Sequence, residues 1–333
     1  MHVLLIGGFK AVIEAAKKLG IRLTVVDQPG KLVSGMDMLT DRVIITHYTR
    51  DLALLPTLKG VHEADPFDMV LSFTEAGLLL AAEISEFLKL VPSVPKKVVE
   101  RTRNKAEMRD ALKAAGIEIP YALVVSHEEV IRFINHFGSP VILKPVDGVG
   151  SHDVVKLNSR EEAVGLKTIQ LDGTASWIVE NFLEGPEFSV EAFSFAGVHV
   201  ILSIHAQTKV GDTWPNPFVE IAHTGPAHLS DDNWEAISNL VSRCLDAVGY
   251  RDGPSHTEVI LTKTGPQIVE THTRVGGDRI FHLMQLSTGV DVFELALSWM
   301  CLKQGALDQS PPRNAAAAIR FFVGRPGKLV SVE

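Results

Sequence analysis

The first hundred residues alternate short apolar runs with helix-like segments, and this alternation constrains the fold more than any other feature. The runs predicted as strands are residues 3–6, 23–27, 42–46 and 69–73, and the helical patterns are residues 11–19 and 76–89. Strands that alternate with helices are typical of a parallel sheet covered by those helices. We therefore expect an α/β, Rossmann-like domain over residues 1–95.

Two positions at the strand ends of this domain carry possible ligand contacts. The first turn, residues 7–10, reads Gly-Gly-Phe-Lys rather than G-x-G-x-x-G, so a dinucleotide site is not supported even though Asp27 ends the second strand. Glu75 follows the strand at residues 69–73, at the edge where open α/β sheets bind ligands. Glu75 is therefore a candidate substrate contact, with a helix N-terminal acid as the alternative.

Charge and hydropathy narrow the class of protein. The chain has 333 residues, 40 acidic and 32 Lys or Arg residues, and a net charge of −8, which disfavours a general nucleic-acid surface. No apolar run is long enough for a membrane span, and the apolar start is too short for a secretion signal. Cys244 and Cys301 lack metal-ligand spacing and read as free thiols. A cytoplasmic protein is expected.

Beyond the first domain the chain divides into three further parts. Residues 91–95 are Pro-rich and predict a linker, followed by a helix over residues 96–115. We expect this linking helix at 96–116, a small α/β lobe at 117–183 and a larger, strand-rich lobe at 184–333.

A predicted hairpin in the last third places two carboxylates opposite each other. Residues 255–261 and 266–274 read as strands joined by a turn at 262–265. Glu258 and Glu270 lie six positions on either side of the turn centre, so they are predicted cross-strand neighbours about 5 Å apart. Such like charges destabilise a sheet unless a cation neutralises them, and Mg²⁺ prefers oxygen ligands. The alternative is a polar sheet face exposed to water.

Two more polar side chains follow on the same strand face. His272 and Arg274 lie two and four positions after Glu270, and side chains at this spacing project from the same side. Two carboxylates with an imidazole and a guanidinium predict a site for a metal and phosphate.

A second predicted hairpin suits phosphate binding. A strand ending in Lys144 meets a loop with Gly148, Gly150 and Ser151, and another strand follows. Glycines let backbone N–H groups approach phosphate oxygens, and Lys144 adds a point charge. The Walker pattern is absent, and the alternative is an ordinary hairpin with a surface lysine.

The link between the two later lobes is a natural place for a ligand. An apolar strand ends at Glu180, and Glu187 opens the next, alternating strand. Backbone groups near Phe182 can hydrogen-bond a purine edge there, and Glu187 can accept hydrogen bonds from ribose hydroxyls. The alternative is a polar strand face in water.

Taken in order, these elements resemble the ATP-grasp superfamily. The order is Lys105, Lys144 with its glycine loop, Glu180 to Leu183 with Glu187, Glu258, and then E-x-H-x-R-x-G-G over residues 270–277. The resemblance implies an ATP-grasp fold, in which two α+β lobes enclose ATP, preceded by a Rossmann-like parallel-sheet domain.

The resemblance also implies a role for each motif residue. ATP phosphates would contact Lys105, Lys144, Gly148, Gly150 and Ser151; adenine would contact Glu180, Phe182 and Leu183; ribose would contact Glu187. Mg²⁺ or Mn²⁺ would bind Glu258 and Glu270. Many relatives have Asn where this chain has His272, so His272 is a candidate third ligand or a substrate contact, although imidazole is softer than Mg²⁺ prefers. Arg274 would stabilise the acyl-phosphate stage together with Lys144, and the N–H groups of Gly276 and Gly277 would face the substrate.

The pattern of residues 270–280 narrows the resemblance to carboxylate–amine ligases that join L-amino acids into dipeptides and to the carnosine synthase type. Residues 219–223 and 317–321 fit the same group, with His223 as a substrate contact. Relatives usually continue well past residues 324–329, so we expect either a reduced terminal lobe or a truncated sequence.

The sequence therefore predicts an ADP-forming ligase that uses ATP and Mg²⁺ to join a small acid to an amine, with a homodimer plausible. Two alternatives stay open: an ATP-grasp carboxylase that uses bicarbonate, and a catalytically silent ATP-binding regulatory protein. No strong base for the amine emerges: His205, His223 and His272 are candidates, but for each one a structural or substrate-orienting role is favoured.

Overall fold

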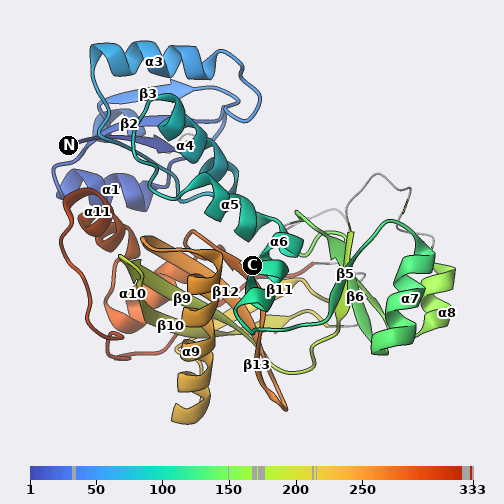
Figure 1. Cartoon of the computed structure of the whole chain (residues 1–333). Helices are drawn as coiled ribbons and strands as arrows, with labels where there is room; N and C mark the ends of the chain where they lie inside the picture. Colours follow the sequence, from blue (N-terminus) through green and yellow to red (C-terminus); the bar gives the residue numbers. More distant parts are fainter. Residues whose placement is uncertain are drawn as a thin grey trace.

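A computed structural model describes every residue except 32–34, 149, 167–170, 172–176, 212–213, 215, 325–330 and 332–333. We expected relatives to continue past residues 324–329. Of these, residues 325–329 lie outside the described residues. Within the described part, the strands form three sheets (Figure 1). Each sheet and the helices beside it make one lobe, and we call these the N-terminal, small and large lobes.

The N-terminal lobe is a parallel sheet, as the alternating pattern predicts. Its strands are β1 (His2–Ile6), β2 (Arg22–Asp27), β3 (Arg42–Ile45) and β4 (Met69–Leu71), in the order β3-β2-β1-β4. Its helices are α1 (Lys10–Lys18), α2 (Met36–Leu39), α3 (Leu54–Ala64) and α4 (Glu75–Phe87). Every residue of β1 is buried, as expected for a parallel strand covered on both faces.

The linking segment is two helices, so the prediction of one helix over residues 96–115 was wrong. Helix α5 (Lys96–Arg103) ends at Asn104, which has an extended backbone, and α6 (Lys105–Ala114) begins after it. The Asn104 side chain accepts hydrogen bonds from the N–H groups of Ala106 and Glu107, which would otherwise be unsatisfied. This cap makes Lys105 the first residue of a new helix.

The small lobe is an antiparallel sheet with two helices beside it. Its strands are β5 (Tyr121–Val124), β6 (Val141–Pro145), β7 (Val155–Leu157) and β8 (Trp177–Asn181), in the order β5-β8-β6-β7, and its helices are α7 (His127–Phe137) and α8 (Arg160–Gly165). β6 and β7 pair antiparallel, so the predicted glycine-loop hairpin is confirmed.

The large lobe is a six-stranded sheet. Its strands are β9 (Glu187–Phe195), β10 (Val198–Lys209), β11 (Glu220–Gly225), β12 (Gly253–Thr262), β13 (Gly265–His272) and β14 (Ala317–Arg320), in the order β13-β12-β9-β10-β11-β14. Its helices are α9 (Asp231–Val248), α10 (Ile280–Thr288) and α11 (Val292–Leu302). The order places β9 between its own hairpin partner β10 and the later strand β12.

The N-terminal lobe packs directly on the large lobe. Figure 1 shows α11 beneath α1, and the aromatic ring of Phe293 in α11 contacts Phe9 and Phe73 of the N-terminal lobe. These rings belong to one apolar core that includes residues of β1, β2, β9 and β10. The first lobe is thereby held against the sheet that carries the acid pair.

Within the described residues, no single helix is long and apolar enough to cross a membrane. Helices α10 and α11 reach that composition only when joined, and they meet at 92°.

Candidate active site

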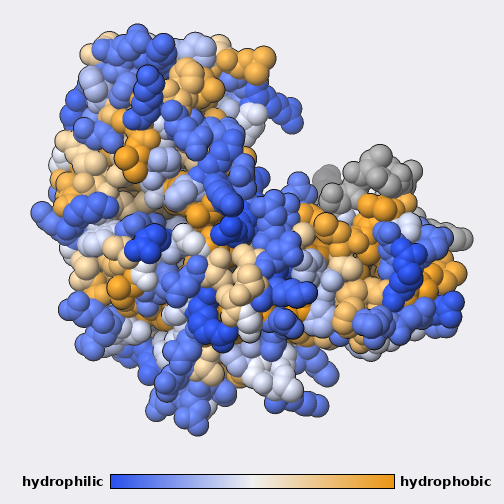
Figure 2. Space-filling view, in the orientation of Figure 1, coloured by the Kyte–Doolittle hydropathy of each residue, from blue (hydrophilic) through white to orange (hydrophobic). Residues whose placement is uncertain are grey.

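A cleft of about 640 Å³ lies between the small and large lobes. Its walls come from α6, the β6–β7 loop, the β8–β9 link, the β12–β13 hairpin and the segment before α10. Figure 2 shows the molecule hollowed between the N-terminal and small lobes, with hydrophilic residues over the linking helices. The predicted site residues that line the cleft are Lys105, Lys144, Gly148, Gly150, Ser151, Glu180, Phe182, Leu183, Glu187, Glu258, Glu270, His272, Arg274 and Gly277.

The two hairpin acids face each other, as the sequence predicts. Glu258 and Glu270 are register partners of β12 and β13, with a bulge directly after Glu258. Their side chains are 19% and 15% exposed, so they open onto the cleft from a largely buried position. Opposed carboxylates in a partly buried site favour a bound cation.

Two further acids add to this negative charge. Carboxylate oxygens of Glu187, Glu220 and Glu258 all lie within 4.8 Å of one another. Burial together with the charge of Glu258 raises the pKa of Glu187, and burial with Glu258 and Glu187 raises the pKa of Glu220 to about 8. The protein thus supplies too little positive charge here, and converging hard oxygen donors suit Mg²⁺ or Mn²⁺.

Two buried lysines bring positive charge to the cleft. Lys105 Nζ lies 3.2 Å from Glu270 Oε2 and donates to the carbonyl of Gly148, which ties α6 to the glycine loop. Lys144 Nζ lies 2.6 Å from Glu180 Oε2. Both lysines are almost completely buried, so their charges are weakly screened.

Glu180, a predicted adenine contact, lines the cleft, and its side chain is also engaged by the protein. Besides Lys144, it binds Arg109, whose Nε donates to Oε1 at 2.6 Å. Burial opposes its charge, but Arg109 and Lys144 hold the pKa of Glu180 at about 2. Glu180 therefore holds Lys144 in place. The sequence reading assigned no role to Arg109, because it lies on α6 far from Glu180 in the chain.

The backbone of the β8–β9 link is only partly free for a purine. The Phe182 N–H donates to the carbonyl of Pro140 at 3.0 Å, whereas no described residue accepts a hydrogen bond from the Leu183 N–H. Apolar side chains including Ile142 and Ile260 line the cleft nearby, and Lys156 Nζ lies 3.9 Å from the centre of the Phe182 ring. The Phe182 N–H is therefore not free for a purine, whereas the Leu183 backbone stays a predicted adenine contact.

Glu187, the predicted ribose contact, is paired with Lys209 on β10. Lys209 also lines the cleft and was not identified from the sequence. The sequence alternation along β10 can place Lys209 on one face of the strand. Its position beside Glu187, however, depends on the antiparallel pairing of β9 with β10.

His272, the predicted third metal ligand, lies between two carboxylates. Its Nε2 lies 3.0 Å from Glu270 Oε1 and its Nδ1 lies 3.2 Å from Glu75 Oε2. Burial lowers the pKa of an imidazole, but Glu270 and Glu75 raise that of His272 overall. Nε2 is taken by Glu270, whereas Nδ1 faces Glu75 without a hydrogen bond, so a metal role for His272 stays a prediction.

Glu75 lies behind the cleft, which corrects its expected contact with substrate. Arg274 Nε donates to Glu75 Oε2 at 2.8 Å, and His272 lies against the same oxygen. Burial opposes ionisation, but His272 and Arg274 hold the pKa of Glu75 at about 2. It is also the first residue of α4, capped by the Thr74 side chain, so the alternative reading as a helix N-terminal acid is correct.

The N–H group of Gly276 is not available to a substrate as expected, because it donates to Glu191 Oε2 at 3.1 Å. A Cβ at Gly276 would lie 2.9 Å from Glu191 Oε1 and from His256 Nδ1, so only glycine fits. Gly277 has open space around it and lines the cleft.

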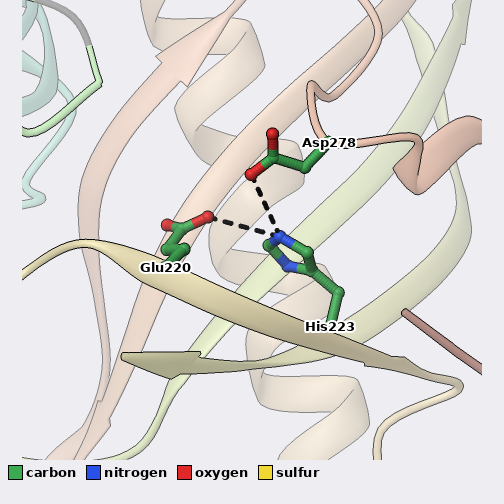
Figure 3. Close-up of side chains that lie close together, drawn as sticks. All are labelled: Glu220, His223 and Asp278. Atoms are coloured by element: carbon green, nitrogen blue, oxygen red, sulfur yellow. Dashed lines mark hydrogen bonds and ion pairs between the residues drawn. The ribbon is translucent and has the colours of Figure 1, made fainter. Parts of the chain in front are cut away.

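His223 lies at the acidic end of the cleft, fully buried (Figure 3). Its Nε2 lies 3.5 Å from Glu220 Oε2 and 3.4 Å from Asp278 Oδ2, and both of these acids line the cleft. His223 and Glu220 come from β11, whereas Asp278 comes from the turn before α10. Through Glu220 this group adjoins the acid pair.

Two family models match the chain. Residues 137–281 match the ATP-grasp domain, and residues 13–92 match the ATP-grasp N-terminal domain. The first match covers part of the small lobe and much of the large lobe, and the second covers most of the N-terminal lobe.

Curated relatives match at low identity. An uncharacterised protein, y4rH, of Sinorhizobium fredii is 30% identical over 274 residues, 78% of this chain and 55% of its own. The alanine–anticapsin ligase of Bacillus subtilis is 26% identical over 248 residues, 65% of this chain and 51% of its own. The chain thus spans about half the length of the curated relatives it matches.

Among solved structures, L-amino acid ligase from Bacillus licheniformis superposes with a TM-score of 0.74 at 26% identity. The match covers 90% of this chain and 73% of that one.

Proposed function

Because this chain belongs to the ATP-grasp superfamily, we propose that it is an ATP-dependent, ADP-forming carboxylate–amine ligase acting through an acyl phosphate. The observation that carries the proposal is the opposed pair Glu258 and Glu270, which shares one cleft with Lys144. Acids that can hold a metal beside cations that can hold phosphate suit phosphoryl transfer.

The chemistry explains why ATP is needed. A free carboxylate has a poor leaving group, so an amine does not displace it in water. In the proposed reaction a carboxylate oxygen attacks the γ-phosphorus of ATP, and ADP leaves. The amine then attacks the carbonyl carbon of the acyl phosphate, inorganic phosphate leaves, and the amine loses a proton.

Each step has candidate groups in the cleft. Glu258 and Glu270 would hold Mg²⁺, which when bound offsets charge that develops on the phosphoryl oxygens. Lys105 and Lys144 would stabilise the same oxygens, and Arg274 would stabilise the oxyanion on the reacting carbonyl. The glycine loop would cover the intermediate and exclude water.

The acidic end of the cleft supports an amine substrate. Asp278 carries a carboxylate that attracts an ammonium group, Glu220 lies beside it, and His223 contacts both from behind. The likeness to an alanine–anticapsin ligase and an L-amino acid ligase supports amino acids as the substrate class.

The test is a matrix of single and paired amino acids with Mg-ATP, in which phosphate release and product mass are measured together. We expect phosphate only with pairs, with a product mass equal to the two amino acids less one water. Glu270→Gln should abolish release, whereas the exposed, matched Glu184→Gln should not.

Two outcomes would overturn the proposal. ADP release that depends on bicarbonate without any amino acid would indicate a carboxylase. ATP binding by calorimetry without phosphate release from any acid–amine mixture would indicate a silent nucleotide-binding protein.

A further inference from the structure

Two carboxylates outside the cleft lining, Glu191 and Glu75, hold the site from behind. Glu191, on β9, binds His256 Nδ1 through Oε1 at 2.6 Å and accepts the Gly276 N–H through Oε2 at 3.1 Å. His256 in turn directs Nε2 toward Glu258 Oε1, 3.7 Å away. Glu191 therefore connects one acid of the pair with the segment after β13.

Glu75 makes the equivalent connection from the N-terminal lobe. Its Oε2 lies 3.2 Å from His272 Nδ1 and accepts a hydrogen bond from Arg274 Nε at 2.8 Å. His272 then reaches Glu270 Oε1 through Nε2 at 3.0 Å. Glu75 thus connects the second acid of the pair with the same segment.

The two connections lie side by side. His256 pairs with His272 across the hairpin, just as Glu258 pairs with Glu270, and the two imidazole rings stack with centroids 6.2 Å apart. Each histidine therefore stands between an outer carboxylate and one acid of the pair. Outer carboxylates of this kind orient the inner groups of metal sites.

We propose that Glu75 and Glu191 are positioning residues of the ligase reaction, which set the geometry of the acid pair and of residues 274–276 together. This inference rests on the proposed function. Neither carboxylate lines the cleft, so neither is placed to touch ATP or substrate. Their influence passes through His272 and Arg274 on one side and through His256 and Gly276 on the other.

Both carboxylates have partners that would be left without them. The Glu191 side chain is 6% exposed and that of Glu75 is 19% exposed, so water cannot fully replace either one. Removing Glu191 would leave a buried imidazole and a buried N–H group without their acceptor. Gly276 would then lose its hydrogen bond to the side chain of Glu191 on β9.

The first experiment compares Glu191→Ala and Glu191→Gln with Ser194→Ala. We expect the alanine variant to lower kcat about 10–100-fold, with the KM for ATP nearly unchanged because the lysines are untouched. Glutamine can still accept from Gly276, so it should restore part of the loss. Ser194 binds His199 on the other face of the same strand, so Ser194→Ala should lower stability and leave kcat unchanged.

A double-variant cycle tests the contact itself. Gly276→Ala should also lower kcat, because its Cβ would press on Glu191 and His256. If both act through one contact, Glu191→Ala combined with Gly276→Ala should lose less than the product of the two single losses. Strictly multiplicative losses would contradict a shared contact.

Glu75→Gln tests the other side in the same way, with a fall in kcat and an unchanged KM for ATP expected. Normal kcat in both single variants, Glu75→Gln and Glu191→Ala, would overturn the inference.

Hydrogen exchange separates this inference from the proposed function. Peptides covering residues 272–278 should exchange faster in Glu191→Ala than in the wild type or in Ser194→Ala. If the wild type releases no phosphate with any substrate pair, the proposed function fails, and the exchange data still decide whether Glu191 holds the segment. Unchanged exchange in Glu191→Ala would refute that part directly.

Discussion

At the residue scale, the buried Lys144 depends on a carboxylate that holds it in place. Glu180 bridges Lys144 and Arg109, so Lys144 has a defined position before any nucleotide binds. Arg109 also donates to the carbonyls of Ile268 and Val269, which anchors this group on β13. A pre-positioned charge costs no reorganisation when the reaction occurs.

Lys144→Met should therefore damage catalysis more than folding. Arg109 would still pair with Glu180, so we expect a folded protein with kcat lowered about 10²-fold and a higher KM for ATP. Steady-state kinetics and circular dichroism measure both effects. Lys263→Met, in the exposed β12–β13 turn, is the matched control. A Lys144→Met protein with normal turnover would exclude this lysine from the mechanism.

The ion pairs of Glu180 also predict how stability varies with pH. The folded pKa is about 2, below the ordinary value of 4.5, so the carboxylate stabilises the fold above about pH 4.5 and this contribution is lost as the pH falls toward 2. Glu180→Gln lacks the charge. Its deficit in the free energy of unfolding should be largest near neutral pH and should shrink below about pH 4.5.

Urea unfolding of both proteins between about pH 7 and about pH 3 measures this difference. A deficit that stays constant over the whole range would show that the ion pairs of Glu180 do not account for it.

At the element scale, the link from β8 to β9 passes close to the end of β12. Gly185 has φ +156°, and a Cβ there would lie 2.2 Å from the Leu261 carbonyl oxygen. The Leu261 N–H donates to the Pro186 carbonyl at 2.9 Å, which fixes the link against the strand. The link has no room to move aside for a larger residue.

Gly185→Ala should therefore destabilise the protein by about 1–3 kcal/mol, since backbone must shift to admit the methyl group. Gly60 is the matched control, because it lies inside α3 with open space around it. Gly60→Ala should raise the free energy of unfolding by about 0.5–1 kcal/mol. Urea unfolding of the two variants should give opposite signs, and equal signs would contradict the packing described for the link.

At the scale of the whole molecule, the cleft is assembled from several parts of the chain. The small lobe supplies Lys144, the linking helix α6 supplies Lys105, and the large lobe supplies the acid pair. The N-terminal lobe reaches the site through Glu75. A ligand held by all of these parts should stabilise them together.

Mg-ATP should thus raise the melting temperature of the whole chain in one transition. At 100-fold excess over Kd the gain is about 2.7 kcal/mol. Chelating Mg²⁺ should reduce the gain, because without a metal the negative charge around Glu258 repels the phosphates. Differential scanning fluorimetry with and without EDTA measures this, with Lys144→Met as a variant expected to respond weakly. An equal gain in EDTA would argue against a metal at the acid pair.

The residue pattern alone determined the features that depend on neighbours in the chain. The alternation of the first lobe, the glycine-loop hairpin and the pairing of Glu258 with Glu270 all follow from local periodicity and one tight turn. In such hairpins the turn sets the register, so facing side chains can be derived from spacing.

Only the tertiary structure decided which buried charges support the site. Glu180 meets Arg109 across 71 residues, His256 meets Glu191 across 65, and Arg274 meets Glu75 across 199. These contacts depend on the order of strands in a sheet and on the docking of one lobe on another. Local periodicity gives the face on which a side chain lies, but the partner comes from whichever element packs beside that face.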